Sequence, residues 1–337
     1  MNRSFKHNGH ICIAGAGMIG TALGNRLASG NGYKVRLFTV EPDVAETING
    51  KHINQKYFPN MKLSRRLLAT TDPHCLNGTD VIFLAVPSTV IVEFIASQKN
   101  EISHDTILIN LAKGFGTADR IITDCLEEII PNPVCSLKGP TFAREILSSA
   151  PTAFTFASRD KSLFPVMADL FGETGIYLDF TNDVHGVEIV SILKNIYAIA
   201  LGIVDAHFNS PNLRFLVLTR AFAEMRKALV FLGGQEETLY HYCGYGDFSL
   251  TALNDLSRNR TLGLLIGKGF FIEDISDKVV LEGRIALNVF INKFSELGKS
   301  EQDFPILFEL FKVFNLDYKV SNFVNNLLVR IDSRIEL

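Results

Sequence analysis

The sequence lacks a surplus of either charge, a cysteine framework and a long apolar run. It has 33 Lys+Arg against 36 Asp+Glu and no basic block, which argues against nucleic acid as a main partner. Its five cysteines form no C-x-x-C pair, so they predict neither a disulfide framework nor a zinc site. The best apolar run, 196–204, is only about half a membrane span. We therefore expect a soluble cytoplasmic protein with no membrane span and no metal.

Two catalytic signatures are also absent. There is no H-E-x-x-H pair of histidines for a metallopeptidase and no G-x-S-x-G elbow for a serine hydrolase. The 337 residues, 47% of them hydrophobic, are typical of a globular protein, and the length favours two domains.

The first half of the chain alternates short apolar runs with amphipathic segments. The predicted strands are 10–14, 34–40, 81–86, 106–111, 134–136, 152–157 and 176–180. Helical spacing of apolar residues occurs between them, at 19–29, 88–97, 118–130 and 162–171. This alternation predicts an α/β fold with a Rossmann-type doubly wound, mainly parallel sheet.

Strand signals nearly disappear from about Asp183 onward. The remaining predicted helices are 184–207, 213–232, 253–269, 280–297, 304–314 and 319–331. The first of them carries the small residues Ala198, Ala200, Gly202 and Ala206, which permit close packing. We expect residues 1–183 to form an NAD-binding Rossmann domain and residues 184–337 an all-α substrate and catalytic domain.

A glycine-rich turn, G-x-G-x-x-G, lies between the first predicted strand and the first predicted helix. Gly15 allows the tight turn, Gly17 lets the backbone approach a pyrophosphate, and Gly20 lets helix and strand pack closely. The helix start then presents free N–H groups and a positive dipole end to phosphates. The competing interpretation is a tight turn with no ligand, and the strand–turn–helix context favours a dinucleotide.

Glu41 indicates which dinucleotide is bound. It lies at the end of the second predicted strand, where an acidic residue accepts hydrogen bonds from the adenosine ribose hydroxyls. The negative charge of Glu41 would repel a 2′-phosphate, and Val40 offers no cation. Arg36, a cation in the same predicted strand, argues in the other direction. NAD is therefore favoured, NADP remains possible, and an ordinary solvated carboxylate is the competing interpretation of Glu41.

Three groups of polar residues are candidates for chemistry. Lys113 follows a strand at the sheet edge where open α/β sheets bind ligands, and Lys194 lies in a mostly apolar helix. Desolvation can lower the pKa of a lysine toward the range useful for proton transfer, whereas a lysine that snorkels to solvent is the alternative. The stretch from Asp247 to Arg260 carries donors for an anionic, hydroxylated small molecule, and a helix-capping loop is its alternative.

Taken in order, these motifs resemble those of the NAD(P)-dependent sn-glycerol-3-phosphate dehydrogenase family over nearly the whole chain. The motifs that carry the resemblance are Gly15–Gly20, Asn54/Tyr57/Pro59, Ala85-Val86-Pro87-Ser88, Lys113-Gly114, Gly139-Pro140-Thr141-Phe142-Ala143-Arg144-Glu145, Leu193-Lys194-Asn195, Asn212 with Thr219-Arg220 and Glu224, Gly246-Asp247, Ser257-Arg258-Asn259-Arg260 and Glu282-Gly283.

The resemblance implies a reductase that interconverts dihydroxyacetone phosphate and glycerol 3-phosphate, which is used in phospholipid synthesis. It implies that Lys194 is the acid/base at the carbinol oxygen and that Lys113 contacts substrate and cofactor. The implied substrate-site residues are Gly139, Thr141, Asp247, Ser257, Arg258 and Asn259. The residues implied to border the cofactor are Met18, Ile19, Ala143, Arg258, Val280 and Glu282.

The chemistry of the residues agrees with these implied roles. Hydride addition to a carbonyl carbon builds negative charge on its oxygen, and the Lys194 ammonium can neutralise and protonate that oxygen. We expect Asp247 to pair with Lys194 and Thr251 to bond the same network. The Arg258 group would hold the phosphate remote from the reacting carbon and so orient the substrate.

The sequence departs from the family pattern at four places. Ile19 stands where bacterial-type members often have an aromatic residue, and Val40 stands where they often have a basic one, which weakens the case for NADP. The segments 207–215 and 253–255 also differ, and either could change the choice of substrate.

Two other functions fit parts of the sequence. A related reductase could act on another small phosphorylated substrate or on a 3-hydroxyacid, and a catalytically silent dinucleotide sensor would keep the glycine turn alone. The arginine motif argues against a carboxylate substrate, and Lys113, Lys194 and Asp247 together argue against a silent protein. The resemblance also implies a homodimer.

Overall fold

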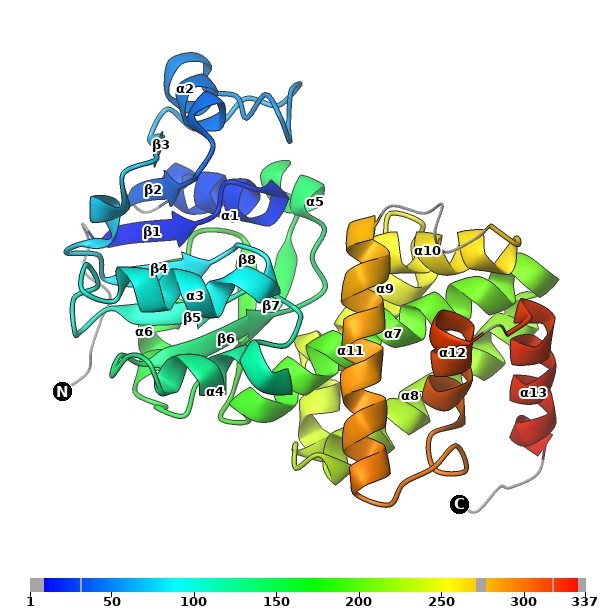
Figure 1. The fold of residues 1–337 in the computed structure, drawn as a ribbon. Helices are drawn as coiled ribbons and strands as arrows, with labels where there is room; N and C mark the ends of the chain where they lie inside the picture. The colour runs from blue at the N-terminus through cyan, green and yellow to red at the C-terminus, as the bar shows by residue number, and fades with distance from the viewer. Residues whose placement is uncertain (1–8, 31, 271–276, 317, 333–337) are drawn as a thin grey trace. The chain divides into compact units, whose positions relative to one another are not determined.

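The computed structural model describes residues 9–30, 32–270, 277–316 and 318–332, which belong to two compact units (Figure 1). The first unit comprises Met1–Glu188 and His241–Cys243, and the second comprises Ile189–Tyr240 and Gly244–Leu337. Helix α7, Val184–Phe208, begins in the first unit and continues in the second.

The first unit contains a sheet of eight strands in the order β3-β2-β1-β4-β5-β6-β7-β8. The strands are β1 His10–Ala14, β2 Lys34–Phe38, β3 Leu67–Thr70, β4 Val81–Leu84, β5 Ile107–Asn110, β6 Val134–Lys138, β7 Thr152–Ala157 and β8 Ile176–Thr181. Every neighbouring pair is parallel except β6 with β7, which is antiparallel. This confirms the predicted fold class. The short strand β3 was not predicted, because only its alternate residues Leu67 and Ala69 are buried.

Helices cover both faces of this sheet, and alternate residues of β1 pack on opposite sides. Ile11 and Ile13 belong to the core that includes apolar residues of α1, α2 and α6, whereas Cys12 and Ala14 belong to the core that includes α3 and α4. The helices of this unit are α1 Met18–Ser29, α2 Pro42–Lys51, α3 Ser88–Gln98, α4 Ile122–Glu127, α5 Ala143–Leu147 and α6 Leu163–Phe171, with 3₁₀ turns at Pro73–Leu76 and Thr117–Asp119. Burial on both faces explains why a central strand such as β4 is continuously apolar in the sequence.

Two details of the first unit differ from the sequence predictions. The predicted helix at 118–130 is reduced to α4, because Ala118 and Asp119 have φ angles of 52° and 56° and cannot continue a right-handed helix. Helices α2 and α5 were not predicted, although Pro42 at the first helical position is a start signal for α2.

The second unit is helical throughout the residues that the structure describes. Its elements after α7 are α8 Pro211–Phe231, a 3₁₀ turn Glu236–Tyr240, a π turn Tyr242–Gly246 whose first two residues belong to the first unit, α9 Asp247–Leu253, α10 Arg258–Gly267, α11 Asp277–Glu296, α12 Pro305–Asn315 and α13 Val320–Asp332. The helix predicted at 253–269 is present but starts later, as α10, because Asn254 adopts an extended conformation between α9 and α10 and its side chain accepts a hydrogen bond from the Leu256 N–H.

Glycines bring α7 and α10 into close contact within the second unit. A Cβ on Gly202 would lie 2.4 Å from the Arg260 carbonyl oxygen, and a Cβ on Gly263 would lie 2.1 Å from the Ile199 carbonyl oxygen. Gly267 similarly faces Ile203 and Ala206 of α7. The small residues predicted to permit close packing therefore let the helix that carries the arginine motif lie directly against α7.

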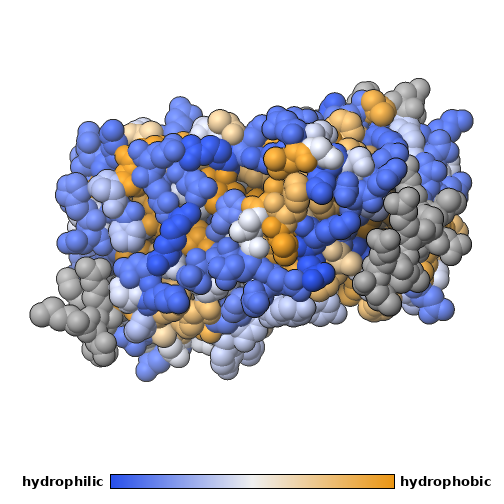
Figure 2. All heavy atoms as spheres, turned by 90° about the horizontal axis from the view of Figure 1, so that it is seen from below, coloured by the Kyte–Doolittle hydropathy of each residue, from blue (hydrophilic) through white to orange (hydrophobic). Residues whose placement is uncertain are grey.

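Helix α7 is long and apolar enough, by length and composition, to cross a membrane, and it is the one such helix among the residues described. However, 94% of its most apolar window is buried inside the protein, as expected for a core helix. On the face drawn in Figure 2, hydrophobic residues form separate patches among hydrophilic ones.

Glu224 of α8 fixes the start of α12. Its carboxylate accepts hydrogen bonds from the backbone N–H groups of Ile306 and Leu307, both at 3.0 Å, and from the Tyr197 hydroxyl at 3.3 Å. Burial raises the pKa of Glu224 to about 7. The folded state therefore holds a proton that the unfolded state releases above about pH 4.5.

We expect Glu224→Gln to remove one part of the pH dependence of stability. The contribution of the raised pKa is fully present below about pH 4.5 and is lost as the pH rises through 7, which amounts to about 3 kcal/mol. Urea unfolding near pH 5 and pH 8 should show the wild type losing about this much stability relative to the variant. Equal losses in both proteins would contradict the prediction.

Candidate active site

The glycine turn at the carboxyl end of β1 packs as the G-x-G-x-x-G motif predicts. Gly15 has φ 116°, and a Cβ there would lie 2.6 Å from the Ala85 carbonyl oxygen. A Cβ on Gly20 would lie 2.0 Å from the Gly15 carbonyl oxygen. A Cβ on Gly17, in contrast, would meet nothing within 4 Å. Packing therefore requires glycine at two positions, and the third leaves open space that a ligand would use.

Asn54 holds the turn in place. Its side chain is fully buried and donates to the Ala16 carbonyl oxygen at 2.9 Å and to the Thr21 hydroxyl at 2.8 Å. Helix α1 begins immediately after the turn at Met18, which is exposed, followed by the half-buried Ile19. Gly17 is the N-cap residue and no side chain caps the helix, so the first N–H groups of α1 remain available to phosphates.

Substitutions at two of the three glycines are expected to affect different properties, folding at Gly20 and dinucleotide binding at Gly17. Gly20→Ala is expected to prevent stable folding of the turn, because its Cβ cannot coexist with the Gly15 carbonyl oxygen. Gly17→Ala should change stability by less than about 1 kcal/mol yet weaken NADH binding at least about 10-fold, because the methyl group occupies the open space. Thermal unfolding and NADH fluorescence titration check both, and unchanged NADH affinity in folded Gly17→Ala would remove the pyrophosphate assignment.

Glu41 is the N-cap residue of α2, and its surroundings include a cation that the sequence did not indicate. The Lys56 ammonium donates to Glu41 Oε1 at 2.8 Å, and Lys56 also lies over the Tyr57 ring. The second oxygen, Oε2, is buried and has no hydrogen-bond partner among the residues described. An orphaned carboxylate oxygen at the end of β2 fits the predicted acceptor for ribose hydroxyls.

Lys113, Gly139 and Thr141 lie together at the carboxyl ends of β5 and β6. The Lys113 ammonium donates to the Gly139 carbonyl oxygen at 3.4 Å, and the Thr141 hydroxyl donates to the same oxygen at 3.2 Å. Gly139 must be glycine, because a Cβ would lie 2.4 Å from the Ala153 carbonyl oxygen of β7. Ala143 is the first residue of α5, close after this group in the chain. The fold thus brings together the first-unit residues that the resemblance assigns to the substrate.

Lys194 is buried in the second unit with two polar partners. Its ammonium lies 2.5 Å from Asp247 Oδ1 and 2.8 Å from the Thr251 hydroxyl. The exposed fractions of Lys194 and Asp247 are 3% and 1%, which excludes a snorkelling lysine. Asp247 and Thr251 stand one turn apart on α9, so a single helix presents both to α7. The predicted pairing of the three side chains is observed.

The arginine motif divides between two roles at the start of α10. Ser257 is the N-cap residue, and its hydroxyl accepts a hydrogen bond from the Arg260 N–H at 3.3 Å. Arg258 is exposed and Asn259 is half-buried in the first turn, where both can meet a ligand. Arg260 turns inward and donates to Asp205 Oδ2 at 2.6 Å. The motif is therefore both a helix cap and a possible anion site.

Asp205, the partner of Arg260, was not predicted from the sequence. It is buried and also accepts two hydrogen bonds from Arg214 Nε, both at 2.8 Å. Arg260 in turn donates to Asp255 and to the Ala252 carbonyl oxygen. No local signal marks Asp205, because its partner Arg260 is 55 residues away in the chain.

The remaining assigned residues lie on α11. Glu282 is exposed on this helix, and the side chain of Val280 lies outside the described residues. In the part of the chain that the structure describes, no group of three His, Cys, Asp or Glu side chains is arranged so that it could hold a metal ion. All five cysteines are free thiols, although Cys12 and Cys75 approach to 3.8 Å between their sulfurs.

Comparison with known proteins identifies one family. The model of the NAD-dependent glycerol-3-phosphate dehydrogenase N-terminus matches residues 10–164, and that of the C-terminus matches residues 183–325. A glycerol-3-phosphate dehydrogenase [NAD(P)+] of Desulfovibrio desulfuricans is 38% identical over 281 residues, which cover 81% of this chain and 83% of that protein. One of Halothermothrix orenii is 31% identical and covers 95% and 94%.

Solved structures agree with these matches. Glycerol-3-phosphate dehydrogenase from Coxiella burnetii superposes with a TM-score of 0.87 at 28% identity, covering 96% of this chain and 99% of that chain. A ketopantoate reductase from Ralstonia eutropha superposes with a TM-score of 0.58 at 16% identity, a likeness of fold alone.

Proposed function

The chain belongs to the NAD-dependent glycerol-3-phosphate dehydrogenase family, and on that basis we propose that it interconverts dihydroxyacetone phosphate and sn-glycerol 3-phosphate with NAD(H) or NADP(H). The observation that carries the proposal is the buried group of Lys194, Asp247 and Thr251. A binding protein without chemistry has no need to bury a lysine beside a carboxylate and a hydroxyl. The glycerol 3-phosphate formed would supply phospholipid synthesis.

We propose different roles for the two predicted domains. Residues 1–183 bind the dinucleotide through the glycine turn and Glu41, and residues 184–337 supply the acid/base group and most of the phosphate site. When bound, the dinucleotide would supply the hydride that reduces the carbonyl carbon. Lys113, from the first domain, contributes a second positive charge for the anionic substrate.

The chain's own residues handle the proton and the phosphate. Lys194 donates a proton to the substrate oxygen as negative charge develops there, and recovers it in the reverse direction. Asp247 and Thr251 accept hydrogen bonds from the ammonium and so fix its direction. Arg258 makes forked, charge-assisted hydrogen bonds to the phosphate, with Ser257 and Asn259 nearby on the same helix start.

The test is an assay of NADH oxidation with the purified chain. We expect oxidation that depends on dihydroxyacetone phosphate and stops when that substrate is omitted. A panel with 2-oxo acids and other phosphorylated ketones tests the substrate class. Turnover confined to carboxylate substrates would assign the chain to a different reductase activity, and NADH binding without turnover on any substrate would indicate a silent binding protein.

Glu41 leads to a prediction about the choice of dinucleotide. Wild type is expected to prefer NADH, because a 2′-phosphate meets the Glu41 carboxylate. In Glu41→Ala, kcat/KM for NADH should fall about 10-fold, since the ribose loses its acceptor. For NADPH it should rise, because Lys56 loses its counter-ion and can pair with the phosphate. Kinetics with both dinucleotides check this, with exposed Glu46→Ala on the same helix as the control. An unchanged ratio between the two cofactors would contradict it.

Two further properties stay predictions. The cytoplasmic location is tested by fractionating cells, and the homodimer by measuring the molar mass of the purified protein in solution.

A further inference from the structure

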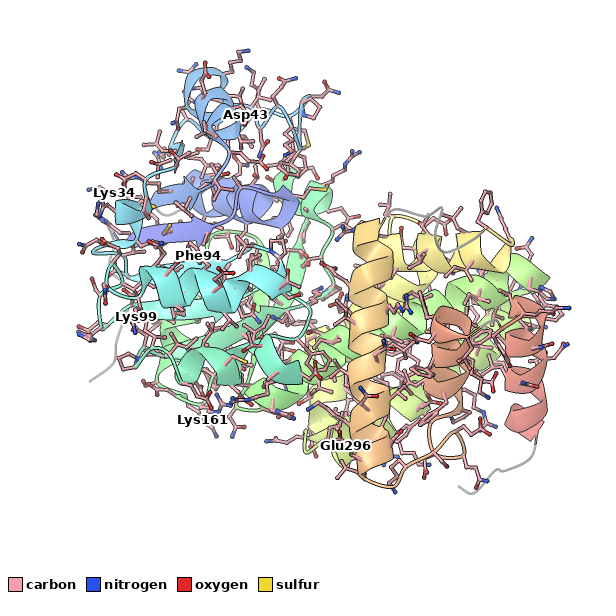
Figure 3. The ribbon with its side chains drawn as sticks, in the orientation of Figure 1. Lys34, Asp43, Phe94, Lys99, Lys161 and Glu296 are labelled. Carbon is pink, nitrogen blue, oxygen red and sulfur yellow. The ribbon has the colours of Figure 1, made fainter. Side chains whose placement is uncertain are left out.

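A buried ion pair lies at the carboxyl ends of β5 and β6 and has no part in the chemistry proposed above. Lys138, the last residue of β6, is fully buried, and its ammonium lies 3.0 Å from Glu188 Oε1 on α7. The charged side chains of Lys34, Asp43 and Lys99, in contrast, are exposed at the periphery of this unit (Figure 3). Neither residue of the pair was predicted from the sequence to have a function.

Every polar group of this pair is engaged. The Asn110 side chain donates to both oxygens of Glu188, at 2.9 and 3.0 Å, and the Ser136 hydroxyl donates at 2.6 Å. The Lys138 ammonium also donates to the Asn110 carbonyl oxygen at 2.9 Å. Asn110 and Ser136 are themselves fully buried. The network therefore ties the ends of two neighbouring strands to the start of α7.

The network reaches Lys113 by two routes. Through the backbone, Asn110 Oδ1 accepts a hydrogen bond from the N–H of Ala112, the residue before Lys113, at 2.9 Å. Through the side chain, the Lys113 ammonium donates to the carbonyl oxygen of Gly139, the residue after Lys138. Contacts and covalent bonds thus form a closed ring from Asn110 through Glu188, Lys138, Gly139 and Lys113 back to Asn110.

The electrostatic surroundings of Lys138 include the positive charge of Lys113. Burial lowers the pKa of Lys138, and the positive charge of Lys113 lowers it further, whereas the Glu188 carboxylate raises it. Glu188 thus balances the charge of Lys138 at the sheet edge that also carries Lys113.

A need for stability does not explain the pair. Taking two charges out of water costs about as much as their attraction returns, so apolar residues of similar volume would often stabilise the fold as well or better. What an ion pair with several hydrogen bonds does provide is a fixed geometry for the groups bonded to it.

We propose that Lys138 and Glu188 are positioning residues that hold Lys113 at the place where it meets the anionic substrate. This inference rests on the proposed function, because that function assigns Lys113 to substrate and cofactor. A small displacement of such a group is expected to cost about 10- to 100-fold in kcat/KM.

The main variant removes both charges together, as Lys138→Met with Glu188→Gln, so that no unpaired charge is left buried. The matched control is Asn132→Ala, which breaks three hydrogen bonds to the carbonyl oxygens of Ser103, His104 and Thr106 near the opposite end of β5. We expect kcat/KM for dihydroxyacetone phosphate to fall 10- to 100-fold in the double variant and less than about 2-fold in the control, measured where both remain folded. Equal effects in both would indicate a structural role and overturn the proposal.

Lys113→Met then shows whether the effect passes through Lys113. If the pair acts by positioning that lysine, adding the double substitution to Lys113→Met should lower kcat/KM no further. If the losses in kcat/KM caused by Lys113→Met and by the double substitution multiplied, the pair would act elsewhere and the proposal would fail.

A measurement without turnover separates this proposal from the proposed function. The rate of reductive methylation of Lys113 by formaldehyde and cyanoborohydride is followed by mass spectrometry of its peptide. We expect a rate change of several-fold in the double variant and none in Asn132→Ala. If the wild type fails to oxidise NADH with dihydroxyacetone phosphate, the proposed function falls, and the methylation rates still decide the positioning. Unchanged methylation in the folded double variant overturns the positioning alone.

Discussion

Lys194→Ala is expected to lower kcat for the reduction of dihydroxyacetone phosphate by about 10²- to 10⁴-fold, the usual contribution of a positioned general acid. The ammonium of Lys194 is buried against Asp247 and Thr251, at 2.5 and 2.8 Å. Helix α9, which carries both partners, contains no lysine that could take over the role of proton donor. The Gly15–Gly20 turn is untouched by the substitution, so NADH should bind with unchanged affinity. Steady-state kinetics and NADH fluorescence titration measure the two quantities separately.

Two controls distinguish loss of the acid from loss of structure. Small alkylammonium ions added to Lys194→Ala should restore part of the rate, because the missing side chain leaves a cavity beside Asp247. Thr251→Val keeps the shape of the site and removes one hydrogen bond, and should lower kcat by only about 10-fold. Turnover retained in Lys194→Ala without added amine would eliminate the mechanism.

Arg258→Met is expected to raise KM for dihydroxyacetone phosphate by about 10- to 100-fold, because a charge-assisted phosphate contact contributes about 1.5–3 kcal/mol. The side chain is exposed at the start of α10, so its loss should leave thermal stability nearly unchanged. Unphosphorylated dihydroxyacetone is a direct check, since its slow reduction does not use the phosphate contact. The wild type and Arg258→Met should reduce dihydroxyacetone at similar rates.

Arg260→Met, two residues further on, should lower the stability of the protein and leave KM nearly unchanged. Removal of this buried arginine leaves the Asp205 carboxylate with Arg214 as its remaining cation and lowers stability by about 3 kcal/mol. Its effect on KM should be small at temperatures where the variant is folded.

If Arg258→Met slowed the reduction of dihydroxyacetone and of its phosphate equally, Arg258 would act on the reacting carbon and the phosphate assignment would be wrong.

Much of the fold could be predicted because its signals are local. Seven of the eight strands were predicted from short apolar runs between helical segments, and a central strand such as β4 is buried along its whole length and wholly apolar. The helix breaks at Ala118 and Asn254 were missed for a different reason. Each depends on the conformation of one or two residues, which leaves the apolar spacing of the sequence unchanged.

The candidate site was partly predictable for the same reason. The glycine turn is a local motif, and the order of Lys113, Lys194 and the arginine motif matches that of a family. Lys56 beside Glu41, Asp205 beside Arg260 and the Lys138–Glu188 pair were not predicted. In these pairs nothing in either residue's neighbourhood along the chain indicates its partner.

By itself, the sequence determined the doubly wound sheet, the helical second half, the dinucleotide turn and the family. Apolar periodicity, glycine spacing and motif order are all recorded in neighbouring residues. The tertiary structure alone decided which arginine faces solvent and which anchors the fold, and that Lys56 pairs with Glu41 and Lys138 with Glu188. Arg260 and its partner Asp205 are 55 residues apart, and Asn110 and Glu188 are 78 apart. Such pairs form only when packing brings distant segments together, because burial makes an unpaired charge too costly and so selects the partner that the fold places within reach.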